Sequence, residues 1–593
     1  MCGIIGYIGN KQAHSILLNC LSTLEYRGYD SCGIAVTNGT VDLFKDAIRV
    51  AALQRKAPKL DGKIGIGHTR WATHGEPSQT NAHPHIDCSG NIAVVHNGVI
   101  NNYQKLKQQL IEEGHNFTSE TDTEVIPHLI EKYYDGILEK ALESALCEIE
   151  GSYSIIAIAS TEAKLVVARK ESPLVIGVGD RENFISSDVP GILAYTNRAI
   201  YLEDGDIGII TAASIAIKQH GIPTSRDEQQ ISWTVEDAQT GGYEHFMFKE
   251  IHEQPKVIRD SLTGWTSDEP IGNILASERV NFEAILILAC GTSYYAGLIG
   301  KYITQELLKI PVRTEIASEF DYLDRTLSKT IVIAITQSGE TADTLRALRK
   351  LKETGCRVIA ITNVVGSTAS RIVDWPLYTR AGPEISIAAT KSFTAQLMAL
   401  YWLMMSYSKI DPRKLSSMTM ELRQLPSKVQ QVLDNEEVII EPAEYIARHE
   451  NVFFIGRGIN FPVALEGALK LKEVSYIHAE GYAAGELKHG PFALLGTDTP
   501  VIAVIAHDST YEAMITNIKE VKARGSTVIA LVPEGDDNVE MIADSIITVP
   551  AVESIFSPVI NTVALQLLAY YAAKKRGCPI DFPRNLAKSV TVE

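Results

Sequence analysis

The sequence has few of the features that mark secreted or membrane-spanning proteins. Its eight cysteines lie far apart with no Cys-x-x-Cys pair, so it predicts neither a disulfide framework nor a structural zinc site. The longest apolar run, 397–405, is about half of the ~20 residues that a membrane-spanning helix needs. The N-terminus also lacks the basic segment of a secretory signal.

Basic residues are in the minority as well. The 55 Lys and Arg are outnumbered by 72 Asp and Glu, which gives a formal net charge of −17 at pH 7. A chain this acidic has no bulk field to attract a nucleic-acid backbone or an anionic membrane, although a local pocket for one anion is compatible with it. We expect a cytoplasmic protein without nucleic-acid or membrane partners.

The length of 593 residues corresponds to about three to five domains. Residues 1–217 alternate short strands with separate helices, which is typical of an α+β layered fold and not of a parallel βαβ chain. Strands are predicted at 3–8, 33–36, 63–67, 92–96, 154–159, 165–169 and 206–210, and helices at 12–24, 102–113 and 123–134. A polar stretch follows, where we place a linker at 218–245.

The rest of the chain has a different rhythm, in which each strand leads into a turn and then a helix. Strands are predicted at 285–289, 331–335 and 358–362, and again at 452–455, 501–505 and 528–532. Residues 330–335 match 499–504 at an offset of 169 residues, and 357–360 match 527–530 at an offset of 170, which predicts a duplicated domain. We expect two doubly wound, flavodoxin-like α/β domains at 275–415 and 445–575, followed by a C-terminal tail at 580–593.

Cys2 is a candidate nucleophile because of its position. A small second residue allows removal of the initiator methionine, and the α-amino group of Cys2, with a pKa near ~8, could then accept the thiol proton. One residue would thus supply both nucleophile and base. The alternative is a small buried cysteine in an edge strand, since free cysteine is commonly buried.

Three polar loops supply the other groups that an amide hydrolase needs; they lie at 68–75, 96–98 and 119–123. Arg70 can pair with a carboxylate in fork geometry, and Asp122 can hold an ammonium group. Asn97 and the N–H group of Gly98 can point at a developing oxyanion. Ser119 is predicted to cap the helix that follows.

The same region is rich in histidine, which raises the alternative of a metal site. His68, His74, His83, His85 and His96 fall within about thirty residues. No cysteine or acidic partner stands at a ligand spacing from them, so we predict no metal here and expect 83–85 to be loop structure.

In the second half, two hydroxyl-rich turns follow predicted strands at 290–294 and 336–341. At helix N-termini such turns can bind a sugar phosphate through hydroxyl and N–H groups, although ordinary helix capping favours the same residues. The candidate binding residues are Thr292, Ser293, Thr336, Gln337, Ser338 and Thr341. Neither turn has the Gly-x-Gly-x-x-Gly pattern, so no dinucleotide cofactor is predicted.

The second copy lacks such a turn, and its distinctive segment is a predicted helix at 463–476. Glu466, Lys470 and Glu473 fall on one face of this helix. A carboxylate and an ammonium group at this spacing suit proton transfer, but the same pattern is common in solvated ion-pair stripes.

These motifs resemble known families. MCGIIGYIG at the N-terminus, LEYRGYDS from Leu24, HTRWATHG from His68, HNG from His96 and SETDT from Ser119 are similar to the glutaminase domain of class II glutamine amidotransferases, which are N-terminal-nucleophile hydrolases. The resemblance implies that Cys2 attacks the glutamine amide and that Asn97 and Gly98 form the oxyanion hole. It also implies further roles: Arg70, Thr73, His74 and Asp122 hold the amino-acid end of glutamine, and Trp71 seals the site and guides ammonia.

The two α/β segments resemble the SIS domains of phosphosugar-binding enzymes. The whole order, with its tail from Pro583, is similar to the glutamine–fructose-6-phosphate aminotransferase family. The resemblance implies that Glu473 moves a proton between C1 and C2 of the sugar beside Lys470. It also implies that His489 of a neighbouring subunit assists ring opening and that Lys588 forms an imine with the open-chain ketose. Lys588 has no signal of its own, because a lysine in a terminal tail is usually exposed.

Taken together, the resemblance implies a homodimer without metal or organic cofactor that makes D-glucosamine 6-phosphate from glutamine and D-fructose 6-phosphate through channelled ammonia. Thr336 and Ala389 stand where many members carry serine, and Ala389 lacks the hydroxyl. Two alternatives remain open. One is a related amidotransferase or deglycase acting on another phosphosugar, and the other is a non-catalytic phosphosugar sensor.

Overall fold

The structure, a computed structural model, describes residues 2–591 apart from 232, 235, 268–281, 323–326 and 328. Met1, the predicted domain start at 275 and the last two residues of the tail lie outside the described residues. The chain folds as two compact units. Unit 1 comprises 1–238, 340–342 and 587–593, and unit 2 comprises 239–339 and 343–586.

Unit 1 contains two antiparallel sheets. The order of the first sheet is β15 (Glu228–Gln230), β11 (Arg198–Tyr201), β9 (Val175–Val178), β10 (Asn183–Ser186), β1 (Gly3–Ile8), β4 (Ile64–Arg70), β2 (Ser31–Thr37) and β3 (Val41–Asp46). The order of the second is β14 (Ile222–Thr224), β13 (Ile215–Gln219), β12 (Asp206–Ile210), β8 (Leu165–Lys170), β7 (Gly151–Ala159), β6 (Ile92–Ile100) and β5 (His85–Ile86).

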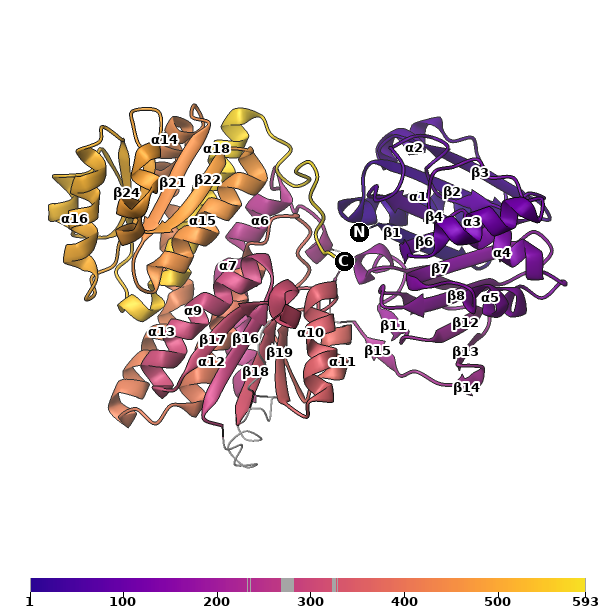
Figure 1. The fold of residues 1–593 in the computed structure, drawn as a ribbon, viewed down its shortest axis with the longest axis horizontal. Helices are drawn as coiled ribbons and strands as arrows, with labels where there is room; N and C mark the ends of the chain where they lie inside the picture. Colours follow the sequence, from indigo (N-terminus) through magenta and orange to yellow (C-terminus); the bar gives the residue numbers. More distant parts are fainter. Residues whose placement is uncertain are drawn as a thin grey trace. The chain divides into compact units, whose positions relative to one another are not determined.

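The two sheets of unit 1 pack face to face and are covered by helices. Ile4 and Ile66 of the first sheet share a core with Val95 of the second. The neighbouring Val94 points the other way and packs with helices α3 (Tyr103–Glu112), α4 (Val125–Tyr133) and α5 (Leu138–Leu146), as the twofold alternation of a strand requires. Helix α1 (Ala13–Leu24) packs on β1 and β4, and α2 (Val50–Lys56) follows β3. Unit 1 is therefore a helix–sheet–sheet–helix stack (Figure 1).

Two predicted features of unit 1 differ in detail. The stretch 218–245, expected to be a linker, contains β14 and β15, which extend the edges of the two sheets. Short polar edge strands carry little hydrophobic alternation, so the sequence pattern conceals them. Ser119 does not cap α4, which begins at Val125; its hydroxyl donates instead to the carboxylate of Glu124 at 2.7 Å.

Unit 2 contains two parallel sheets with the same strand order, 2-1-3-4-5 in chain sequence, which is the flavodoxin-like order. The first consists of β17 (Val312–Ile316), β16 (Ala284–Ala289), β18 (Thr330–Ile335), β19 (Arg357–Thr362) and β20 (Trp375–Tyr378). The second consists of β22 (His478–Ala483), β21 (Asn451–Gly456), β23 (Val501–Val504), β24 (Val528–Pro533) and β25 (Ser545–Val549). The predicted duplication is thus visible in the topology.

Helices cover both faces of each parallel sheet. In the second sheet, Phe453 packs with α16 (Tyr511–Lys522), whereas the next residue, Phe454, packs with α15 (Asn460–Ser475) and α18 (Ser557–Arg576) (Figure 1). The other helices are α6 (Phe246–His252), α7 (Gln254–Ser267), α9 (Gly291–Leu308), α10 (Ala342–Glu353), α11 (Thr368–Ile372), α12 (Lys391–Tyr407), α13 (Pro412–Asp434), α14 (Glu437–Ile446) and α17 (Asp537–Glu540).

One hydrophobic core runs through both copies of unit 2. It joins Ile287 and Ile333 of the first sheet to Phe454 and Ile502 of the second through the helices between them. Residues 554–576, which include α18, are long and apolar enough to cross a membrane, but 94% of the apolar window is buried in this core. The segment is accordingly a core helix of unit 2.

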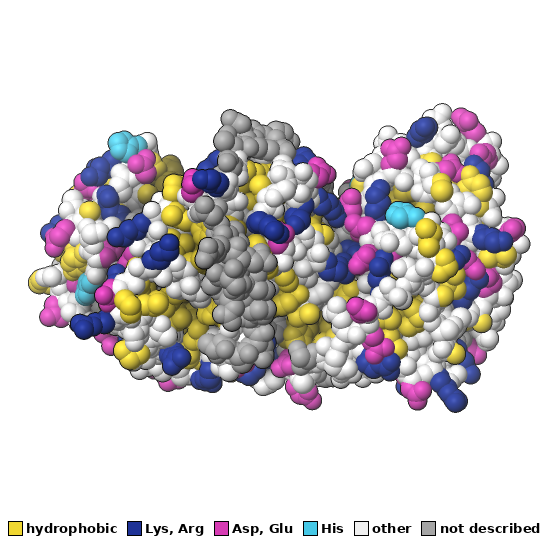
Figure 2. Space-filling view, turned by 90° about the horizontal axis from the view of Figure 1, so that it is seen from below, with side chains coloured by type: hydrophobic (Ala, Val, Ile, Leu, Met, Phe, Trp, Pro, Cys, Tyr) yellow, Lys and Arg dark blue, Asp and Glu magenta, His cyan; other side chains and the backbone are white. Residues whose placement is uncertain are grey.

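The surface of the protein mixes charges of both signs. On the face shown in Figure 2, Lys and Arg side chains are interspersed with Asp and Glu side chains. Among the residues coloured in that view, the basic side chains do not gather into one extended patch.

Candidate functional site

Cys2 is held at the start of β1 by the neighbouring strand. Gly3 pairs with Thr69 of β4 and its N–H donates to the Thr69 hydroxyl at 3.1 Å. The Cys2 sulfur accepts a hydrogen bond from the N–H of Trp71 at 3.2 Å. Burial raises the pKa of the Cys2 thiol, although the Trp71 N–H and the charge of Arg70 oppose the shift. A thiol in this environment needs a base to become a nucleophile.

Asn97 and Gly98 lie beside Cys2 on β6. The Asn97 side-chain amide donates to the carbonyl oxygen of Cys2 at 2.7 Å, and its oxygen lies 3.1 Å from Nε2 of His68. Burial lowers the pKa of His68 to about 3, so this imidazole is neutral and can donate to Asn97 from Nε2. His68 in turn stacks on His83 at 4.1 Å between ring centroids. These histidines support Asn97.

Gly98 occupies a position that only glycine fits. Its φ is +134°, and a Cβ atom there would lie 2.0 Å from the carbonyl oxygen of Ser152. Gly98 lines the cavity that Cys2 also lines, and the strand can follow this path only where the residue has no side chain.

Arg70 and Asp122 provide charge of both signs at the same cavity. Arg70 is 3% exposed, and its Nη2 donates to the carbonyl oxygens of His74 and, at 3.0 Å, Gly75. Its Nη1 is buried without a hydrogen-bond partner among the described residues, so it is available to a carboxylate. Asp122 is fixed by the N–H of Ile100 at 2.9 Å.

The structure thus gathers most of the predicted glutamine-site residues around one small cavity of about 30 Å³. The predicted residues on its wall are Cys2, Arg70, Trp71, Thr73, Asn97, Gly98 and Asp122. His74 is not on the wall; its ring packs against Tyr103 at 5.4 Å and its carbonyl oxygen holds Arg70. The wall also includes residues that sequence reasoning missed, namely His83, His96, Thr121, Thr123 and Thr591.

Both hydroxyl-rich turns follow the carboxyl ends of adjacent parallel strands of unit 2, namely β16 and β18. Ser293 lies in the first turn of α9 after β16, where its hydroxyl accepts from Gln396 at 3.0 Å. The turn 336–341 follows β18, and Gly339, at φ +70°, passes so close to Ser367 that a Cβ would lie 2.1 Å from its hydroxyl. The Ser367 hydroxyl is buried without a hydrogen-bond partner among the described residues. Ser367 is the N-cap residue of α11, which follows β19. Ser367 is a further candidate that the sequence analysis missed.

The predicted acid–base helix meets the first of these turns. Lys470 Nζ lies 2.5 Å from Glu473 Oε2, 3.6 Å from Glu466 Oε1 and 3.0 Å from the Thr292 hydroxyl. Thr292 also donates to Glu466 at 3.3 Å. The side chains of Lys470 and Glu466 are each 1% exposed and that of Glu473 is 21% exposed, so this is no solvated surface stripe.

Burial separates the roles of the two carboxyl groups. It raises the pKa of Glu466 to about 8, and Oε2 of this residue is buried without a hydrogen-bond partner among the described residues. Burial opposes the charge of Lys470, but Glu466 and Glu473 raise its pKa to about 12. The arrangement fits a protonated Glu466 beside an ion pair between Lys470 and the more exposed Glu473.

The other two predicted catalytic residues of the sugar site are His489 of unit 2 and Lys588 of unit 1. His489 is exposed at the end of the short 3₁₀ helix Ala484–His489, and its side chain makes no hydrogen bond or ion pair with another described residue. Lys588 is half-buried in the tail and belongs to unit 1.

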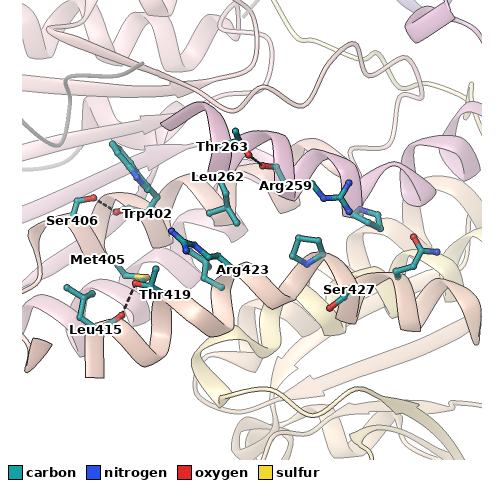
Figure 3. Close-up of a pocket in the computed structure, with 14 residues that line it drawn as sticks. Arg259, Leu262, Thr263, Trp402, Met405, Ser406, Leu415, Thr419, Arg423 and Ser427 are labelled. Carbon is teal, nitrogen blue, oxygen red and sulfur yellow. Dashed lines mark hydrogen bonds between the residues drawn. The ribbon is translucent and has the colours of Figure 1, made fainter. Parts of the chain in front are cut away.

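A larger cavity, of about 860 Å³, lies elsewhere in unit 2 between α7, α12 and α13 (Figure 3). Leu262 of α7 and Arg423 of α13 face one another across it, and Trp402 and Met405 of α12 complete an apolar wall. None of the predicted site residues lines this cavity. The convergence of reactive groups, and not cavity size, therefore identifies the candidate sites.

Comparisons with known proteins identify the domains of the chain. Residues 68–194 match the glutamine amidotransferase domain, and residues 281–406 and 445–576 match the SIS domain. Glutamine–fructose-6-phosphate aminotransferase [isomerizing] of Caldanaerobacter subterraneus is 50% identical over 608 aligned positions that cover 100% of both chains. The enzyme of the same name from Methanosarcina acetivorans is 48% identical, again with 100% of both chains covered.

The chain belongs to the glutamine–fructose-6-phosphate aminotransferase family. The C-terminal domain of glucosamine-fructose-6-phosphate aminotransferase from Francisella tularensis matches with 36% identity and a TM-score of 0.55, covering 58% of this chain and 99% of that one. A phosphosugar isomerase structure from Silicibacter pomeroyi matches with 25% identity and a TM-score of 0.51, covering 57% and 99%. The predicted fold class, a glutaminase domain followed by two SIS domains, is confirmed, and membership of this aminotransferase family makes the protein an enzyme.

Proposed function

We propose that the protein transfers the amide nitrogen of L-glutamine to D-fructose 6-phosphate and isomerises the product to D-glucosamine 6-phosphate, releasing L-glutamate. The observation that carries this proposal is the cavity that joins the Cys2 sulfur, Asn97, Gly98 and an unpaired nitrogen of Arg70. A nucleophile, an oxyanion site and a carboxylate site at one cavity are the parts that hydrolysis of a free amino-acid amide requires.

The proposed first reaction takes place at Cys2. After removal of Met1, the α-amino group accepts the thiol proton and the sulfur attacks the amide carbon. Asn97 Nδ2 and the Gly98 N–H stabilise the oxyanion that forms. The C–N bond then breaks as the proton is transferred to the nitrogen, so that ammonia departs and a thioester with Cys2 remains. Water then hydrolyses the thioester to glutamate. Arg70 holds the α-carboxylate and Asp122 the α-ammonium group, with Thr73 and His74 completing the site.

The proposed second reaction uses the hydroxyl-rich turns that follow β16 and β18, helix α15 and Lys588 of the C-terminal tail. The turn hydroxyls and N–H groups bind the sugar phosphate at the N-termini of α9 and α10, through Thr292, Ser293, Thr336, Gln337, Ser338 and Thr341. Lys588 forms an imine with the ketose carbon as the carbonyl oxygen leaves as water, and ammonia then replaces the lysine amine on that carbon. Glu473 moves the proton between C1 and C2 beside Lys470. His489 of the partner subunit assists ring opening in a homodimer.

Ammonia must reach the sugar without equilibrating with water, because protonation would remove its nucleophilic electron pair. We propose that Trp71 closes the glutamine site and directs ammonia onward. The proposed chemistry needs no metal or organic cofactor, since Lys588 supplies the amine that activates the carbonyl group. We also propose that the enzyme works in the cytoplasm without nucleic-acid or membrane partners.

The test is product analysis with glutamine that carries a labelled amide nitrogen. With fructose 6-phosphate as the acceptor, the label is expected in glucosamine 6-phosphate, and Cys2→Ala should abolish this labelling. Parallel reactions with other ketose and aldose phosphates address the alternative of another phosphosugar substrate. Absence of labelled glucosamine 6-phosphate from the active wild-type protein would refute the proposal.

A further inference from the structure

A second group of ionisable side chains lies on unit 1 away from the Cys2 cavity. Cys88 lies in the turn between β5 and β6, and His115 follows α3. His128 and Glu131 stand three residues apart on α4. One ligand atom from each of these four residues lies within 4.8 Å of all the others, and none of the four lines the Cys2 cavity.

The distances between the ligand atoms are those of a metal coordination shell. Cys88 Sγ lies 3.7 Å from His115 Nδ1 and 3.5 Å from His128 Nδ1. Glu131 Oε2 lies 3.0 Å from His115 Nδ1 and 3.6 Å from His128 Nδ1. Zinc bonds of ~2.0–2.3 Å at tetrahedral angles place ligand atoms roughly 3.4–3.6 Å apart, so one ion fits at the centre with small adjustments.

Neighbouring groups orient these ligands. The N–H of Asn116 donates to Cys88 Sγ at 3.3 Å and holds the sulfur in place. The N–H groups of Cys88 and Ser89 donate to the two oxygens of Glu131 at 3.1 and 3.2 Å and fix its carboxylate.

The His128 ring is held by neighbouring groups on the side away from its Nδ1 atom. Its ring is 1% exposed and packs on Phe117 at 4.4 Å between centroids. Its Nε2 is buried without a hydrogen-bond partner among the described residues and lies 3.9 Å from Glu124 Oε1. An imidazole that binds a metal through one nitrogen commonly directs its other N–H toward a carboxylate.

We propose that Cys88, His115, His128 and Glu131 bind one zinc ion. A mixed set of one thiolate, two imidazoles and one carboxylate suits zinc, and four protein ligands leave no open position for catalysis. The ion is structural: it ties the β5–β6 turn and the segment after α3 to α4. Since Asp122 and Thr123 of the glutamine cavity immediately precede α4, the ion also stabilises the backbone that carries them.

The test uses the full-length protein, stripped with a chelator and titrated with zinc chloride against a chromophoric chelator. Wild type is expected to bind one equivalent at this site. Cys88→Ser should weaken binding by more than the ~10–100-fold that loss of an outer-shell partner causes. Cys147→Ser is the matched control, because Cys147 is exposed in the same unit and lies outside the four-ligand group; it should bind as wild type does.

Cobalt(II) gives an independent readout. Wild type and Cys147→Ser should show the visible bands of tetrahedral cobalt and a thiolate charge-transfer band, which Cys88→Ser should lose. Glu131→Gln keeps one carbonyl oxygen that can accept from these N–H groups and loses the anionic ligand. A Glu131→Gln protein that folds by circular dichroism but binds zinc weakly would therefore show that the carboxylate acts as a metal ligand and not only as a hydrogen-bond acceptor. Failure of wild type to bind zinc, or unchanged binding by Cys88→Ser and Glu131→Gln, would overturn the proposal.

Discussion

Replacing Gly98 by alanine should damage glutamine hydrolysis with little effect on the thiol itself. The new Cβ would lie 2.0 Å from the Ser152 carbonyl oxygen, at a φ of +134° that L-residues avoid, so β6 must shift away from β7. The shift moves the Gly98 N–H out of the oxyanion position. Loss of one oxyanion donor lowers kcat by ~10²–10³, and we expect Gly98→Ala to lower the kcat of glutamine hydrolysis by at least this factor.

The assay is glutamate release, measured beside alkylation of Cys2 and circular dichroism. Gly136→Ala is the matched control because Gly136 has a φ of +99° in the same unit but nothing within 4 Å of the added Cβ. It should lower Tm slightly through backbone strain and leave kcat unchanged. A folded Gly98→Ala protein whose Cys2 reacts normally and whose kcat stays within about twofold of wild type would refute the assigned oxyanion geometry.

Three further predictions concern single groups. Cys2→Ala should abolish glutamine-dependent synthesis and leave calorimetric binding of fructose 6-phosphate intact, whereas loss of both would contradict two separate sites. Arg70→Lys keeps the charge but loses the guanidinium fork that includes Nη1, which has no hydrogen-bond partner among the described residues. The KM for glutamine should rise about 10- to 150-fold, which corresponds to the loss of one charge-assisted hydrogen bond. An unchanged KM would show that Arg70 does not bind the carboxylate of glutamine. Burial raises the pKa of Glu466 from 4.5 to about 8, so the contribution of this group to stability is full below about pH 4.5 and is lost as pH rises through about 8. The Tm of Glu466→Gln relative to that of wild type should therefore increase across this window in calorimetric scans. A Tm difference that does not change with pH would count against the raised pKa.

The elements that the sequence predicts are those with strong hydrophobic patterns. The central strands β16, β18, β21 and β24 are apolar runs buried on both faces, and each lies where the sequence predicts a strand. The edge strand β22 was missed because its sequence, HAEGYA, is polar and only partly buried. Edge strands have one neighbour and one solvated side, so their side chains need not carry a strand pattern.

The candidate sites likewise contain some residues that the sequence identifies and others that it does not. Local loops such as 68–75 and 336–341 are visible as motifs because their residues are contiguous. The helical pattern of Glu466, Lys470 and Glu473 is the same whether the face is solvated or buried, and only Thr292, far away in the sequence, settles the question by contacting Glu466 and Lys470. The Cys88, His115, His128 and Glu131 group gives no motif in the sequence, because its members come from three separate segments of the chain.

The core that runs through both parallel sheets has a consequence for the history of the duplicated segment. Neither copy can be removed without exposing part of the shared core, because α9 of the first copy packs against α15 of the second. The two copies also differ in what they carry: the first has the two hydroxyl-rich turns, and the second has the buried Glu466 beside Lys470. Because they share one core, the duplicated segment can be inherited only as a pair.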